Sequence, residues 1–156
     1  MAYKVVKCKD DIYYSCIVDG YSTKEYIINE WAKRNKELGP LCIFKSFYNV
    51  ANFLNIFREP AILNHIKFLN FLTIKNFKIF KCKYKKSAHN IVWKIEDIGF
   101  LNYTICSSLS TLPEGTILCD NVKLIEEINI LEVKKFFEGL NKAKEELISK
   151  SFEILE

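Results

Sequence analysis

Hydrophobic and polar residues alternate along several short stretches of the chain. From Ile12 to Val18 every second residue is apolar, and Tyr3–Cys8 is rich in aromatic and β-branched residues. Because the side chains of a strand point alternately to its two faces, both stretches are predicted strands. Lys9, Asp10 and Asp11 between them form a short hairpin loop. Leu41–Phe44 is a further predicted strand.

The segment Ser22–Leu38 fits two patterns. Ser22 and Glu25 have the spacing of a capping box, and Leu38-Gly39-Pro40 is typical of a helix end, so a helix is favoured. The strand propensity of Tyr26–Trp31 favours a strand instead. The sequence leaves both open.

Two helices are predicted in the middle of the chain. Ser46 is the expected N-cap of the first, which ends at Arg58-Glu59-Pro60. Its apolar face consists of Val50, Phe53, Leu54 and Phe57. The second, Ala61–Leu72, is apolar on nearly all sides and is expected to be buried, or alternatively to lie on a membrane surface or a partner.

The stretch Ile74–Lys86 combines basic and aromatic residues at the period of a strand. One face carries Phe80, Cys82 and Tyr84, and the opposite face carries Lys81, Lys83 and Lys85. Since Phe77 and Ile79 fall on the lysine face, a bulge or sharp twist is expected near Lys78. The lysine row is interpreted first as protection of an exposed sheet edge. The alternative is a row that follows the phosphates of a nucleic acid.

The last third of the chain predicts three strands and a long helix. The strands are Ile91–Ile95, Leu101–Ser107 and Thr116–Val122, with turns at Glu96-Asp97 and Leu112–Gly115. The helix runs from Leu131 to Phe152 and is expected to pack on the sheet of its own chain through Val133, Phe136, Phe137, Leu140, Leu147 and Ile148. A heptad pattern in this helix is interrupted at Lys150. Residues 1–156 thus predict one α+β domain, a mostly antiparallel sheet of about six to seven strands with two or three helices.

Composition and charge narrow the functional classes. The chain has 156 residues, of which 49% are hydrophobic, enough for a folded core. Its net charge is +4, and eight lysines but no acid lie between His65 and Lys94. Arginine, which makes bidentate phosphate contacts, occurs only at Arg34 and Arg58. No apolar run is long enough to predict a transmembrane segment.

Few residues offer catalytic or metal chemistry. The six cysteines lack knuckle spacing, so no metal is expected, and they are interpreted as reduced thiols of a cytoplasmic protein without a signal peptide. A dyad of Cys82 with a histidine lacks an orienting acid, and the glycines form no nucleotide-binding loop, so neither a catalytic residue nor a cofactor is assigned. His65, His89 and Asp120 are the candidates for a polar site.

Three stretches resemble small accessory proteins of large DNA viruses and phages: Tyr3–Val6, Gly39–Phe44 and Pro113–Leu124. The resemblance implies an accessory or virion-associated protein of the host cytoplasm or the virion, and it implies no site residue.

The first expectation is therefore a non-enzymatic protein that acts through a protein partner. One alternative is binding of single-stranded nucleic acid through the basic strand, with the contact residues Lys75, Lys78, Lys81, Lys83, Lys85, Lys86, Tyr84 and Trp93. The other is an enzyme whose site is assembled from Asp120, His65, His89 or a cysteine. The oligomeric state is left open.

Overall fold

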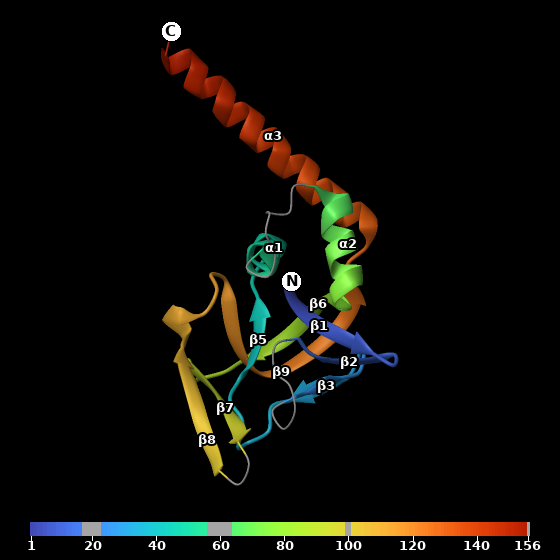
Figure 1. Cartoon of the computed structure of the whole chain (residues 1–156), viewed down its shortest axis with the longest axis vertical. Helices are drawn as coiled ribbons and strands as arrows, with labels where there is room; N and C mark the ends of the chain where they lie inside the picture. Colours follow the sequence, from blue (N-terminus) through green and yellow to red (C-terminus); the bar gives the residue numbers. More distant parts are fainter. Residues whose placement is uncertain (17–22, 56–63, 99–100, 156) are drawn as a thin grey trace.

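The structure is a computed structural model that describes residues 1–16, 23–55, 64–98 and 101–155, and across these residues it is an α+β fold (Figure 1). The elements follow one another as β1 (Ala2–Lys9), β2 (Ile12–Ser15), β3 (Glu25–Tyr26), β4 (Trp31–Lys33), β5 (Leu41–Phe44), α1 (Phe47–Asn55), α2 (His65–Lys75), β6 (Phe77–Lys86), β7 (Ile91–Ile98), β8 (Leu101–Ser108), a 3-10 turn (Leu109–Thr111), β9 (Thr116–Glu127) and α3 (Ile130–Leu155).

The predicted hairpin between β1 and β2 is confirmed. Lys9 pairs with Ile12, which leaves Asp10 and Asp11 as a two-residue loop. Both have positive φ, 52° and 62°, as the hairpin turn that matches the twist of the strands requires. Aspartate tolerates this conformation better than most residues, so the local sequence is sufficient for the turn.

The main sheet closes on itself. All its pairings are antiparallel: β1 pairs with β5 and β6, and β9 pairs with β5 and β6 as well. These four pairings form a ring. Outside the ring, β2 pairs with β1, β3 pairs with β2, and β4 pairs with β9. β7 and β8 form a separate antiparallel hairpin.

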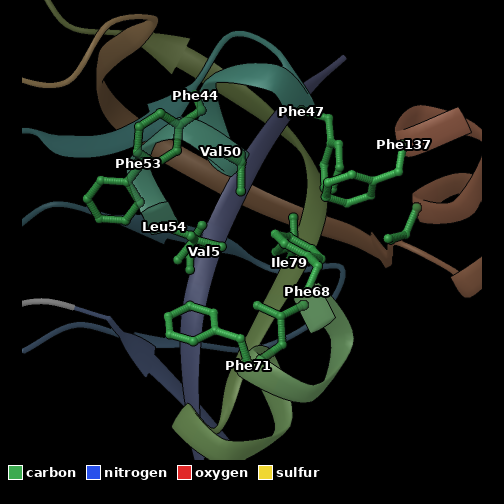
Figure 2. Close-up of a cluster of buried hydrophobic side chains, with 12 residues drawn as sticks. Val5, Phe44, Phe47, Val50, Phe53, Leu54, Phe68, Phe71, Ile79 and Phe137 are labelled. Carbon is green, nitrogen blue, oxygen red and sulfur yellow. The ribbon is translucent and has the colours of Figure 1, made fainter. Parts of the chain in front are cut away.

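The ring is buried on both of its faces. Alternate residues of β1 and β6 belong to two different hydrophobic clusters: Val5 and Ile79 to one, Val6 and Phe80 to the other. The first cluster lies beneath the helices and contains Phe44, Phe47, Phe53, Phe68, Phe71 and Phe137 (Figure 2). The second is formed by strand residues from β1, β3 to β6 and β9 and fills the interior of the ring. Two-sided burial explains why both strands contain adjacent apolar residues, Val5 with Val6 and Ile79 with Phe80.

Burial on both faces corrects two expectations for the basic strand. The register between β1 and β6 is continuous across Lys78, so the bulge expected there is absent, since Phe77 and Ile79 have an apolar layer of their own. The register shifts lie instead opposite β9, between Lys81 and Cys82 and between Lys85 and Lys86. β6 pairs with β1 over Phe77–Cys82 and with β9 over Phe80–Lys86. Protection of a free edge therefore does not explain Lys81, but it stays an interpretation of Lys83, Lys85 and Lys86, which among the described residues pair with β9 alone.

The helices α1 and α2 begin where local signals place them. The Ser46 hydroxyl accepts a hydrogen bond from the backbone N–H of Asn49, as expected of the N-cap of α1. Asn64 caps α2 in the same way, and Asn76 in the left-handed conformation ends it. The predicted end of the first helix at 58–60 and the predicted start of the second at 61–63 lie outside the described residues. Because α2 continues to Lys75, the basic strand starts at Phe77 rather than Ile74.

Three further predictions concern segment type. The open segment 22–38 forms two short strands, β3 and β4, rather than a helix within its described part. The turn expected at Glu96-Asp97 is wrong, because β7 continues through both residues to Ile98. The last predicted strand is longer than expected, since β9 reaches Glu127.

The long C-terminal helix is confirmed, but its expected packing holds only for its first half. Val133 and Phe137 are buried against the helices over the sheet, whereas Leu147 is 65% and Phe152 64% exposed. The second half of α3 projects away from the body of the protein (Figure 1). A helix of 26 residues is about 39 Å long, and α1 and α2 already cover the sheet face.

Candidate nucleic-acid interface

Three short segments of β4, β9 and β6 lie side by side and form a grid. Trp31 pairs with Lys123, which pairs with Lys83, and Lys33 pairs with Asn121, which pairs with Lys85. Between these rows lie Ala32 and Val122, which are buried in the ring. The two outer rows therefore point away from the ring, and we call Trp31, Lys33, Lys83, Lys85 and Lys123 the lysine–tryptophan face.

The lysines of this face have no neutralising partner among the residues that the structure describes. Among the described residues, no carboxylate forms a salt bridge with Lys33, Lys83, Lys85 or Lys123. Lys83 lies directly opposite Lys123, and like charges in this position destabilise a sheet. The three segments of the grid contain no acidic residue. The face therefore concentrates positive charge on one part of the sheet.

Trp31 lies within this charge and is 44% exposed. The Lys85 and Lys123 ammonium groups lie 5.2 and 5.8 Å from the centre of its ring. Exposed cation–π contacts are worth about 0.5–1 kcal/mol, whereas stacking of a base on an aromatic ring is worth about 1–3 kcal/mol. A base can thus replace the lysines over the ring, which leaves their charges for phosphates.

The structure divides the predicted lysine row into two groups. Lys78 forms a salt bridge with Glu127, and Lys81 bridges Glu126 of β9 and Glu132 of α3. Lys78 thus joins β6 to β9, and Lys81 joins the sheet to α3. The hydrogen bonds that Lys81 donates to Glu132 and Glu126 raise the pKa of Lys81. Lys83 and Lys85 belong to the lysine–tryptophan face, Lys86 is exposed beyond the second register shift, and Lys75 lies at the end of α2.

The two predicted stacking residues lie elsewhere. Tyr84 is in the middle row of the grid, beside Val122, and points to the opposite side from Lys83 and Lys85. Trp93 donates its ring N–H to the Glu37 carbonyl and packs against Arg34 and His89. Neither shares a face with the unpaired lysines.

Two of the three predicted polar-site residues meet at Arg34. Its Nε donates to Asp120 at 2.8 Å and its Nη2 lies 3.3 Å from His89 Nε2, which must be the acceptor because a guanidinium only donates. Arg34 holds the pKa of the Asp120 carboxyl below its usual range. His65 lies at the start of α2 and is not part of this cluster. The cluster connects the segment after β4 to β9 and to the loop after β6.

The cysteines show no sign of activation. All six are free thiols, and burial raises the pKa of Cys82 and of Cys119 to about 12. A thiol in this state is a poor nucleophile. Within the part of the chain that the structure describes, no three metal-ligating side chains cluster, and no helix is long and apolar enough to cross a membrane.

Sequence reasoning missed Trp31, Lys33 and Lys123. The alternation Trp31-Ala32-Lys33 and Asn121-Val122-Lys123 indicates strands with one buried residue between two outward ones. Which strands are neighbours depends on pairings that in this grid lie 36 to 92 residues apart in the chain, and no local signal contains them. Comparison of the chain with known protein families, with curated proteins and with solved structures finds no match.

Proposed function

We propose that this protein binds single-stranded nucleic acid through the lysine–tryptophan face. The observation that carries the proposal is the grid in which four lysines without a carboxylate partner among the described residues surround an exposed tryptophan. Single-strand binding surfaces combine these two features, a positive track for the backbone and an aromatic ring for a base. That the protein is a viral accessory or virion-associated component stays an expectation from the sequence resemblance.

The geometry favours a single strand over a duplex. Neighbouring strands of a sheet lie about 4.8 Å apart and alternate residues of one strand about 6.6 Å apart, so the lysines form a compact patch around Trp31. An exposed ring on a flat sheet stacks with a base only if that base is free of its partner strand. We therefore expect a labelled single-stranded oligonucleotide to bind better than a blunt duplex of the same length.

The test of the ring is Trp31→Ala, with binding measured by fluorescence anisotropy. Loss of stacking predicts a decrease in binding free energy of about 1–3 kcal/mol. Tyr48→Ala is the matched control, because Tyr48 is also an exposed aromatic residue but lies on α1. Equal affinity of the wild-type protein and Trp31→Ala for the oligonucleotide would contradict the proposed role of the ring.

A second candidate function, protein binding, is supported by the projecting half of α3. Its exposed apolar residues recur at helical spacing, namely Leu147, Ile148, Phe152 and Ile154. The charges along this half are mixed, with three basic and three acidic residues, namely Lys142, Lys144, Lys150, Glu145, Glu146 and Glu153. Two such helices in antiparallel orientation bring opposite charges together and cover both apolar faces, so the partner we propose is a second copy of this chain.

Analytical ultracentrifugation tests this second candidate. We expect a concentration-dependent dimer, which Leu147→Glu with Ile148→Glu converts to a monomer without loss of thermal stability. The control is Lys142→Glu with Glu153→Lys, which exchanges the two charges and retains the dimer. A wild-type protein that is monomeric at high concentration would exclude self-association through α3.

A further inference from the structure

A cavity of about 270 Å³ lies between β1, β5 and β7. Its walls are largely apolar and include Phe44, Phe53, Leu41, Val92, Trp93 and Leu112. Three cationic residues, Lys4, Lys24 and Arg34, also line it, and none of the described lining residues is acidic. An apolar cavity with a few convergent polar groups is typical of a small-molecule site.

Lys4 is the unusual residue of this cavity. It lies in β1 between the buried residues Ala2 and Val6 and is itself only 7% exposed. Its Nζ donates to the Cys42 carbonyl at 2.7 Å and lies 5.2 Å from the centre of the Tyr26 ring. No described carboxylate pairs with it, although buried charges in proteins are normally paired.

The pKa of Lys4 lies above its ordinary value. Burial lowers this pKa, and the interactions with Tyr26, Cys16 and Cys42 raise it by more. Since Lys4 has three N–H donors and Cys42 accepts only one of them, it retains donors for a ligand.

Tyr26 supplies a second observation. Its side chain is 2% exposed and lines the same cavity as Lys4. Its hydroxyl interacts with the Lys4 ammonium, but no group of the described residues lies within hydrogen-bond distance of it. Buried hydroxyl groups are almost always hydrogen-bonded, so an unpartnered one beside a cavity indicates a partner that comes from outside the chain.

We propose that this cavity binds a small amphiphilic carboxylate, with the carboxylate on the Lys4 ammonium and the Tyr26 hydroxyl and the apolar body against Phe44 and Phe53. One ammonium and one hydroxyl match the two oxygens of a monoanion. A phosphate is a poorer fit, because phosphate sites commonly use arginine, and Arg34 is already bound to Asp120 and to the Leu38 carbonyl. The proposal is independent of nucleic-acid binding, since no residue of the lysine–tryptophan face lines the cavity.

Isothermal titration calorimetry of the full chain at neutral pH tests the proposal with three probes of equal chain length, octanoate, octan-1-ol and octylamine. We expect octanoate to bind at least about tenfold more tightly than octan-1-ol, the effect of a charged hydrogen bond, and octylamine not to bind. Lys4→Met keeps the length of the side chain and removes its charge. This variant should lower the affinity for octanoate about tenfold or more and change the affinity for octan-1-ol by less than about twofold.

Lys9→Met, a change at the exposed end of β1, is the matched control and should leave all three affinities unchanged. If Lys4→Met does not fold, Tyr26→Phe decides. Because no group of the described residues lies within hydrogen-bond distance of the Tyr26 hydroxyl, this change should weaken the binding of octanoate about fivefold without lowering the melting temperature. Equal binding of octanoate and octan-1-ol, no binding of octanoate at millimolar concentration, or octanoate binding that Tyr26→Phe leaves unchanged would each overturn the proposal.

Discussion

The salt dependence of oligonucleotide binding is the sharpest consequence of the lysine–tryptophan face. The perturbation is Lys83→Gln combined with Lys123→Gln, because these two lysines lie directly opposite each other and have no carboxylate partner among the described residues. Each substitution removes a charge and keeps a polar side chain of similar length. Removal of two opposed like charges should not destabilise the fold.

The magnitude follows from counterion release. For a single strand the slope of log Kobs against log salt is about −0.7 for each phosphate neutralised, so four lysines predict a slope of about −2.8. Between 50 and 200 mM salt the wild-type protein should lose affinity about fiftyfold, and the double variant, with a slope of about −1.4, only about sevenfold. Trp31→Ala should lower the affinity at every salt concentration and leave the slope unchanged, because stacking releases no counterions.

The assay is a fluorescence anisotropy titration of a labelled oligonucleotide at five salt concentrations. The matched control is Lys142→Gln with Lys144→Gln, which removes the same charge from the exposed part of α3. A wild-type slope shallower than about −1 would refute the reasoning. The reasoning would also be refuted if the slope of the control variant became as shallow as that of the double variant. Binding would then depend on the net charge of the protein and not on the lysine–tryptophan face.

Three further predictions test the fold. Gly39→Ala should lower the free energy of unfolding, measured by urea denaturation, by about 1–3 kcal/mol, because the new Cβ would lie 2.5 Å from the Trp93 backbone nitrogen. A stability equal to that of the wild-type protein would contradict this contact. Phe137→Ala should cost about 3–5 kcal/mol and Phe152→Ala less than about 0.5 kcal/mol, since only the former is buried; similar losses in the same assay would mean that the end of α3 packs on the body. With iodoacetamide at mildly alkaline pH, mass spectrometry should find Cys106 modified rapidly and Cys82 only after unfolding, and equal rates would show that the interior of the ring is open.

Short-range signals in the sequence were sufficient to predict many of the helices, strands and turns. The two aspartates of the first loop accept the positive φ that the turn needs, and Ser46 supplies the hydrogen bond that starts α1. The alternation from Phe80 to Lys85 correctly separates inward and outward residues of β6, because side-chain direction in a strand depends only on the local backbone. The α+β class and the single long C-terminal helix follow from the same local patterns.

Other features depend on which strands meet. The sequence gives no signal that Lys4 is buried, and its burial beside Tyr26 exists only because β1 and β3 contribute to one interior. The sequence likewise contains Trp31, Lys83 and Lys123 at separations of 40 residues and more. Only the pairing of β4 and β6 on either side of β9 brings them to one face. Local backbone preference determines where a side chain points, and the long-range register, set by burial of the whole apolar surface at once, determines what it meets.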